Sequence, residues 1–122
     1  MKIPKPVMDR RRSIRIAEKL PFAIGHGHYE TEAETVNISG HGALCRVERD
    51  IPVMTQLKVA LSLPSVRKGA RAKVIAMKGV VVRKEKDALS QKYFIAVFFS
   101  DIQPADRRFL EKFIESRLAA NA

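Results

Sequence analysis

Strict alternation of apolar and other side chains is the feature that most constrains how this chain folds. Between positions 57 and 63 every odd position is leucine or valine, every even position is lysine, alanine or serine, and Pro64 follows directly. Successive side chains of a β-strand point to opposite faces, so this pattern predicts a strand with one buried face. Proline lacks the backbone N–H that would continue the pairing, so the strand is expected to end there.

Five other segments carry the same alternation or a short apolar run bounded by glycine, proline or polar residues. Residues 25–28 predict a hairpin loop, because their glycines accept a positive φ. Lys78-Gly79 interrupts the fifth segment and predicts a bulge. Residues 93–99 are apolar at odd and even positions, which is typical of a strand covered on both faces. We therefore predict six strands, over 20–24, 29–38, 43–47, 57–63, 71–84 and 93–99.

The end of the chain changes to a helical period. From Pro104 to about residue 119, apolar side chains recur three and four positions apart, and proline is favoured in a first helical turn. We expect the apolar stripe of this helix to pack on the strand over 93–99. The predicted fold class is all-β with one helix. It is a six-stranded antiparallel β-barrel with a C-terminal α-helix, both within residues 20–122.

Positive charge is concentrated in two segments of this chain, whose formal net charge is +10. Residues 1–25 hold seven basic and two acidic side chains, and residues 66–86 hold eight basic and one acidic. Residues 1–19 follow neither period and contain two early prolines, so we expect a flexible basic N-terminal arm. Two basic zones indicate an anionic partner, or serve only solubility. We interpret 66–86 as a solvated basic hairpin. Nucleic-acid binding is not favoured, because none of the eight aromatic residues lies there to stack on bases.

Length and cysteine content set the remaining limits. At 122 residues the chain is long enough for one hydrophobic core and too short for two. Residues 1–6 are not followed by an apolar run, and no stretch approaches the length of a membrane span. We therefore expect no secretory signal and no membrane insertion. The single cysteine, Cys45, excludes an intramolecular disulfide and is typical of a cytoplasmic protein.

Two short motifs carry the candidate chemistry. Arg11 and Arg15 form an R-x-x-x-R pair, and Asn37, Ser39 and Gly42 form N-x-S-x-x-G further along. An arginine guanidinium is a permanently charged planar fork that binds phosphate or the edge of guanine through two hydrogen bonds. Asn37 and Ser39 lie two positions apart, so they are expected to point the same way from a strand, and the glycine permits a close backbone approach. The arginine spacing alone is weak evidence, but the ordered pair of motifs is a strong signal.

This ordered pair resembles the PilZ domain family, whose pattern is R-x-x-x-R, a spacer of some 20–30 residues, and then D/N-x-S-x-x-G. Both motifs match without a substitution, and the predicted six strands and helix look like the barrel of that family. The resemblance implies a bacterial, cytoplasmic receptor for the second messenger cyclic di-GMP. It implies a ligand site made of Arg10, Arg11, Arg15, Asn37, Ser39 and Gly42. In this family the residue before the first motif arginine is associated with ligand number, and a basic Arg10 favours a stacked pair over one molecule.

The resemblance also implies how the signal leaves the domain. No catalytic constellation is visible, so we expect no enzyme activity and no cofactor besides the ligand. The output would pass by a conformational change to an effector protein that the sequence does not identify. A basic barrel that binds RNA or single-stranded DNA is the alternative, and an adaptor whose motifs no longer bind ligand is a third possibility.

Three histidines and the cysteine were also weighed as site residues. His26, His28 and His41 lie in expected loops without a metal-binding pattern, so we interpret them as solvent-facing and predict no metal site. Cys45 lies on a predicted strand, with no histidine spaced to activate it, and is interpreted as a small core residue.

Overall fold

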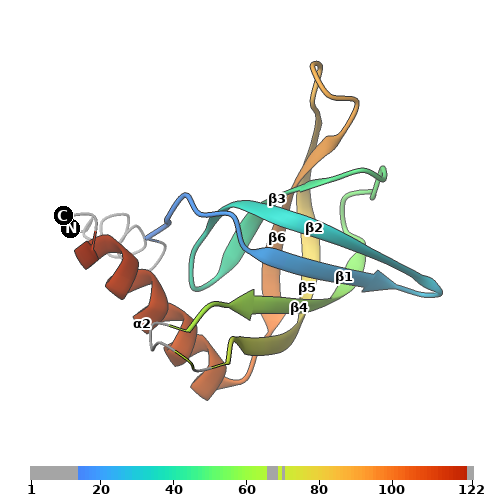
Figure 1. Ribbon diagram of the computed structural model, residues 1–122. Helices are drawn as coiled ribbons and strands as arrows, with labels where there is room; N and C mark the ends of the chain where they lie inside the picture. Colours follow the sequence, from blue (N-terminus) through green and yellow to red (C-terminus); the bar gives the residue numbers. More distant parts are fainter. Residues whose placement is uncertain (1–13, 66–68, 70, 121–122) are drawn as a thin grey trace, which may run out of the picture.

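Six antiparallel strands close into a barrel, with one helix at its end (Figure 1). The computed structural model describes residues 14–65, 69 and 71–120, so Arg10 and Arg11 of the predicted site lie outside the described residues. The strand order around the barrel is β1-β2-β3-β6-β5-β4. The predicted barrel with a C-terminal helix is confirmed. The elements are β1 Pro21–His26, β2 Tyr29–Ile38, β3 Gly42–Val47, β4 Gln56–Leu63, β5 Lys73–Lys86, β6 Tyr93–Asp101 and α2 Pro104–Ala120.

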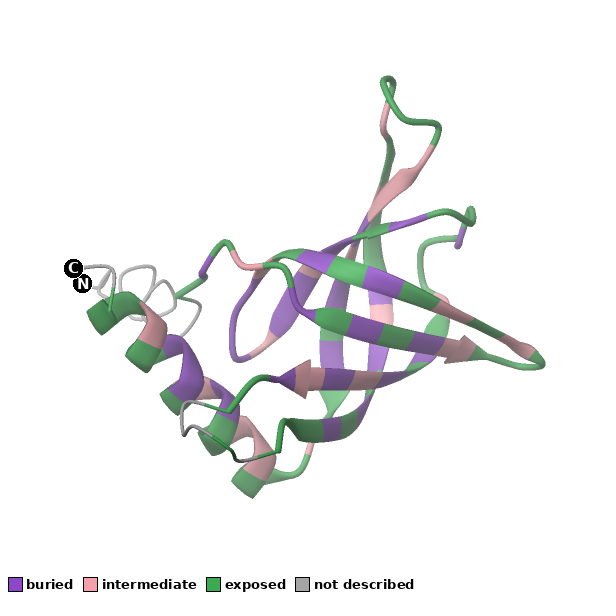
Figure 2. Ribbon diagram, viewed as in Figure 1, coloured by how far each residue is buried: buried purple, intermediate pink, exposed green. Residues whose placement is uncertain are grey.

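The alternation along the strands divides core from surface (Figure 2). On β4 the four odd positions are at most 3% exposed, as the sequence predicts. On β5 the buried positions are Ile75, Met77, Gly79 and Val81, while Val74 and Val82 of the opposite parity are more than half exposed. The barrel interior is therefore filled by one face of each strand, which is the only way a closed sheet of this size buries a core.

The sixth strand differs from its expectation. Ile95, Val97 and Phe99 are buried in the barrel, but Phe98 is 48% exposed and Phe94 is half-buried. The prediction that both faces of this strand are covered is wrong, and so is the prediction that the helix lies on it. Helix α2 instead lies across one end of the barrel (Figure 1), which leaves the apolar outer face of β6 uncovered.

Helix α2 buries one stripe and makes polar contacts at two places along its length. Leu110, Phe113 and Ile114 are buried at 6% exposure or less. Near the start of the helix, Arg107 Nε donates to the backbone carbonyl of Gly40 at 3.3 Å. Near its end, Arg117 pairs with a residue that precedes β1, as described below. The helix therefore contacts both the turn between β2 and β3 and the segment that enters the barrel.

The described part of the basic segment 66–86 does not form a hairpin by itself. Of this segment the structure describes 69 and 71–86, and β5 runs through it as one strand of 14 residues. The strand pairing shifts between Lys78 and Gly79, as predicted, and again between Val81 and Arg83. The continuous strand arises because both irregularities are bulges that bend the strand without reversing it.

No helix among the described residues is long and apolar enough to cross a membrane.

Candidate functional site

The structure brings one residue of each motif into direct contact. Ile16 forms an antiparallel bridge with Ile38, with both backbone N···O distances at 2.9 Å. This bridge lays the segment before β1 along the end of β2. Arg15 then lies beside Asn37, and its Nη1 donates to the side-chain Oδ1 of Asn37 at 2.8 Å. The Ile16–Ile38 backbone pairing thus brings together two residues that are 22 positions apart in the sequence.

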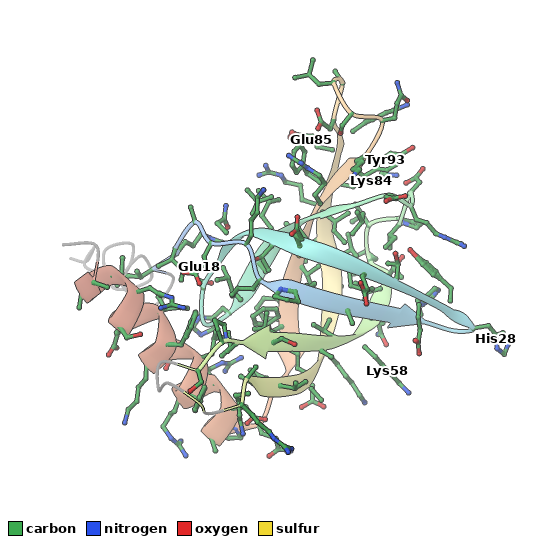
Figure 3. The ribbon with its side chains drawn as sticks, viewed as in Figure 1. Glu18, His28, Lys58, Lys84, Glu85 and Tyr93 are labelled. Atoms are coloured by element: carbon green, nitrogen blue, oxygen red, sulfur yellow. The ribbon has the colours of Figure 1, made fainter. Side chains whose placement is uncertain are left out.

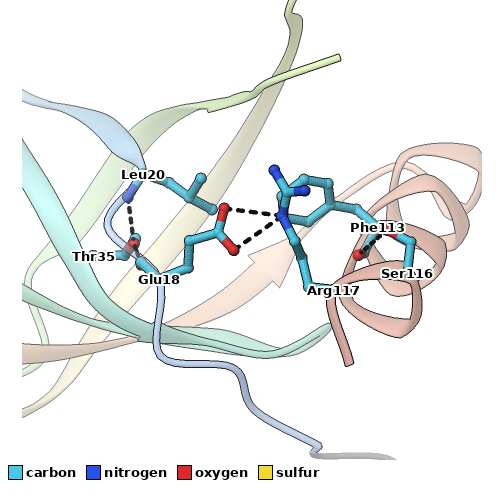
Figure 4. A network of polar contacts seen from close by, with 6 residues as sticks. All are labelled: Glu18, Leu20, Thr35, Phe113, Ser116 and Arg117. Atoms are coloured by element: carbon cyan, nitrogen blue, oxygen red, sulfur yellow. Dashed lines mark hydrogen bonds and ion pairs between the residues drawn. The ribbon is translucent and has the colours of Figure 1, made fainter. Parts of the chain in front are cut away.

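A buried hydroxyl holds the same segment three residues further on (Figure 4). Thr35 is 1% exposed, and its Oγ1 donates to the carbonyl of Glu18 at 2.6 Å while it accepts from the backbone N–H of Leu20 at 2.9 Å. The carboxylate of Glu18 accepts from Nε of Arg117 at 3.0 Å and 3.1 Å. The backbone that carries Arg15 is therefore fixed to β2 on one side and to α2 on the other.

Ser39 and Gly42 hold the turn between β2 and β3. Ser39 is 1% exposed, and its Oγ donates to the carbonyl of Gly42 at 3.3 Å and accepts from the N–H of His41 at 3.2 Å. A Cβ at Gly42 would lie 2.6 Å from the backbone carbonyl oxygen of Val97 on the neighbouring strand. In this structure both residues shape the turn that follows Asn37, and among the described residues it is Asn37 of the three whose side chain bonds Arg15.

A β-bulge next to Asn37 interrupts the pairing of β2 with β3 on the outer face of the barrel. The pairing of β2 with β3 shifts between Thr35 and Asn37, which leaves Val36 without a partner and 37% exposed. A bulge re-aims the side chains around it, so bulges are frequent beside binding sites. Asn37 itself pairs with Leu44 of β3.

This bulge borders a shallow groove of about 230 Å³ on the outer face of β2, β3, β5 and β6. Arg46 adds a cation above the groove, with its guanidinium carbon 5.2 Å from the ring centre of Phe94. The sequence interpretation missed the groove, although the apolar even positions of β6 were its visible signal. Its lining residues are Val36, Leu44, Arg83, Glu85, Phe94 and Ala96.

The larger hollow on the surface is lined by none of the motif residues that the structure describes. It measures about 1090 Å³, lies mainly over β1, β4 and β5, and also includes Glu30, Thr31 and Glu32 of β2. Its floor includes small residues such as Ala23, Ala60 and Ala76, with Lys58 beside them (Figure 3). Size alone does not make a ligand site, and the smaller groove is the one that adjoins the two motifs.

The described residues offer no metal site, and Cys45 is not an activated nucleophile. No group of three histidine, cysteine, aspartate or glutamate side chains among them could hold a metal ion. His26 lies with its Nδ1 3.2 Å from the carbonyl of Gln56. Cys45 is completely buried, and burial raises the pKa of its thiol far above the usual range. A thiol that stays protonated is a poor nucleophile, so this cysteine is a core residue.

Comparison with known families agrees with the motifs. The PilZ domain model matches residues 9–116, so the chain belongs to the PilZ domain family. A search of curated proteins gave no significant match.

Three solved structures share the fold. The inhibitor of motility MotI/DgrA of Bacillus subtilis superposes with a TM-score of 0.80 at 22% identity, over 91% of this chain and 52% of that one. PlzA of Borreliella burgdorferi, solved with c-di-GMP, gives 0.62 at 13% identity, over 97% of this chain and 57% of that one. The PilZ domain of YcgR from Escherichia coli, also solved with c-di-GMP, gives 0.59 at 16% identity, over 92% of this chain and 98% of that one. This chain thus spans just over half the length of the first two.

Proposed function

We propose that this chain is a receptor for cyclic di-GMP that acts without catalysis in the bacterial cytoplasm. The observation that carries the proposal is the contact between Arg15 and Asn37, one from each motif, in a barrel of the PilZ family. Two structural neighbours, PlzA and the YcgR domain, were solved with c-di-GMP, which supports the choice of ligand.

The described residues fit the chemistry of such a ligand. A cyclic dinucleotide presents two phosphates and two guanines, and Arg15 is a fork that can bind either group through two hydrogen bonds. Asn37 already orients this guanidinium, so part of the ordering cost of binding is met before the ligand arrives. Arg10 and Arg11 would supply further guanidiniums from the preceding segment. Ser39 and Gly42 contribute by fixing the turn that positions Asn37.

The groove beside Asn37 supplies an apolar surface for a purine. Phe94 and the aliphatic side chains around it offer an apolar surface for a base, and the Arg46 guanidinium that lies over the Phe94 ring can itself stack on a purine. Its volume, about 230 Å³, is below the range of about 300–1,000 Å³ usual for ligand pockets. We therefore assign only part of the ligand to the groove, and assign the N-terminal arginines to the part that lies outside it.

Titration calorimetry of the full chain with cyclic di-GMP tests the proposal. Each charge-assisted hydrogen bond contributes about 1.5–3 kcal/mol, so Arg15→Ala and Arg11→Ala should each weaken binding at least about tenfold. Arg108→Ala, on the exposed face of α2, is the matched control and should bind as the unchanged protein does. Unaltered affinity in both motif variants would remove these arginines from the site, and no heat at all with the unchanged protein would end the proposal.

The alternative, a nucleic-acid-binding barrel, gains little from the structure. Three basic side chains of β5 lie at different places: Lys73 pairs with Asp106 of α2, Lys78 lines the large hollow, and Arg83 lines the groove. In the same titration a single-stranded oligonucleotide should bind only weakly, with an affinity that falls steeply as salt rises.

A further inference from the structure

The β5–β6 hairpin extends beyond the barrel and leaves one backbone edge uncovered. The pairing of β4 with β5 ends at Gln56 and Val80. The next residue, Val81, bonds the loop before β4: its N–H donates to the carbonyl of Thr55 at 3.0 Å, and its carbonyl accepts from Met54 at 2.6 Å. Beyond Val81, among the described residues, β5 has backbone partners only on β6. In Figure 1 the tip of this hairpin rises above the rest of the barrel.

The register identifies the backbone groups on the open edge. Asp87 donates its N–H to the carbonyl of Lys92 at 2.8 Å, and Glu85 lies opposite Phe94 two residues earlier. In an antiparallel pair, residues bonded to the partner alternate with residues whose N–H and C=O point away. The backbone N–H and C=O groups of Lys84 and Lys86 therefore point away from β6. An unpaired edge of this kind is a template for another strand.

Charge selects the type of strand that can pair there. The hairpin from 83 to 92 contains Arg83, Lys84, Lys86 and Lys92 against two acidic residues. Lysines on an edge prevent pairing with a like edge, because equal charges face each other directly across the strands. The same lysines favour an acidic strand, because opposite charges that face each other across two strands attract. The only ion pair of Lys84 among the described residues is with Asp50, so one carboxylate already lies at this edge.

The tip of the hairpin is ordered and carries an apolar side chain. Asp87 accepts from the hydroxyl of Ser90 at 2.6 Å and from the N–H of Leu89 at 3.1 Å. These bonds shape the turn, while Leu89 is 96% exposed, the highest value among the exposed large hydrophobic residues of the described chain. The edge of β5 and the ordered turn after it therefore present a partner with unpaired backbone groups, charged side chains and one exposed leucine.

We propose that an acidic, extended segment of a partner protein adds to β5 as a further strand, along Val82 to Lys86. Backbone hydrogen bonds to Lys84 and Lys86 provide the affinity, and carboxylates beside these lysines provide the selectivity. A second copy of this chain is a poor occupant, because its own β5 would place lysine opposite lysine. This site is separate from the proposed cyclic di-GMP site in its backbone contacts, so the two proposals fail independently.

The test uses the full chain, labelled with ¹⁵N, and a capped hexapeptide of alternating glutamate and valine. The amides of Lys84 and Lys86 should show the largest shifts and slower hydrogen exchange, and the binding should weaken as salt rises. A hexapeptide of alternating lysine and valine, and a glutamate peptide with N-methylated valines, should bind at least about fivefold more weakly, the equivalent of one net hydrogen bond. Equal binding by either control peptide, or shifts that map elsewhere, overturns the proposal.

A pair of variants separates the backbone from the charge. Lys86→Gln and Lys86→Pro both lack the ammonium group, but only the proline variant lacks the exposed N–H. Proline at an edge position leaves the bonds to β6 in place, so the variant is expected to fold. The glutamate peptide should bind Lys86→Pro about fivefold more weakly than Lys86→Gln. Equal affinities contradict strand addition. Shifts of the Lys84 and Lys86 amides on raising the protein concentration alone would assign the edge to self-association instead.

Discussion

Glu18 and Arg117 are 99 positions apart, and their side chains form an ion pair with Nε···Oε distances of 3.0 Å and 3.1 Å. Glu18 lies three residues after Arg15, on the segment proposed to bind ligand. Arg107, ten residues before Arg117 on the same helix, contacts the carbonyl of Gly40 in the motif turn. Helix α2 is thus in polar contact with both motif segments, and a displacement of either one would reach it.

Loss of the Glu18 carboxylate should destabilise the fold. Both side chains of its pair with Arg117 are 30% exposed or less, so Glu18→Gln should lower the free energy of unfolding by about 0.5–1 kcal/mol in urea. Glu85→Gln is the control, because its pair with Arg83 is 3.7 Å long and both side chains are about 70% exposed. That variant should unfold as the parent does. Equal effects of the two changes would mean that the Glu18 contact adds nothing.

Gly42 should not tolerate a methyl group. The Cβ of Gly42→Ala would meet the carbonyl oxygen of Val97 at 2.6 Å, and a backbone atom cannot move aside cheaply. We expect a loss of about 1–3 kcal/mol in the free energy of unfolding. At Gly25 the nearest atoms would be 3.8 Å from a new Cβ, so Gly25→Ala should change stability by less than about 0.5 kcal/mol. Chemical denaturation of the two variants side by side measures the difference.

Phe94 should contribute to ligand affinity. If a guanine stacks in the groove, Phe94→Ala removes a contact worth about 1–3 kcal/mol and weakens cyclic di-GMP binding by about tenfold. Phe109→Ala is the matched aromatic control, since this ring is 45% exposed on α2. It should leave the titration unchanged. An unaffected Phe94→Ala variant would place the bases outside the groove while leaving the role of Arg15 intact.

The hairpin tip should loosen in acid. Hydrogen bonds from the Ser90 hydroxyl and the Leu89 N–H hold the pKa of Asp87 below its ordinary value of 3.8. A pKa lowered in the folded state means that the charged form stabilises the turn above the ordinary pKa, and that this stabilisation is lost as pH falls through the lowered value. The Leu89 amide signal should therefore titrate with a midpoint below 3.8, and Ser90→Ala should raise that midpoint. A midpoint that Ser90→Ala does not move would contradict the assignment.

The alternation and spacing of apolar residues were enough to predict the strands and the helix. The predictions were wrong where the burial of a residue depends on elements distant in sequence. The alternation in β4 and the helical spacing after Pro104 were sufficient for the strands, the helix and the barrel. The position of α2 could not be predicted from β6 alone. Phe94 and Phe98 suggested a face covered by the helix, but the pattern of apolar residues along a strand does not distinguish a covered face from an exposed apolar groove. The order of the two motifs indicated a shared site, and the structure brings Arg15 of one motif to Asn37 of the other. It did not indicate that Ser39 is buried within the turn.

The close approach of Gly42 to Val97 bears on how relatives of this chain are interpreted. Closure of the barrel demands a residue without a side chain at this position, with or without a bound nucleotide. A glycine at this position in a homologous sequence is therefore evidence that the barrel is intact, and not evidence that the protein binds a nucleotide. Discrimination between members that bind ligand and members that do not should rest on the counterparts of Arg15 and Asn37, whose side chains join the two motif segments.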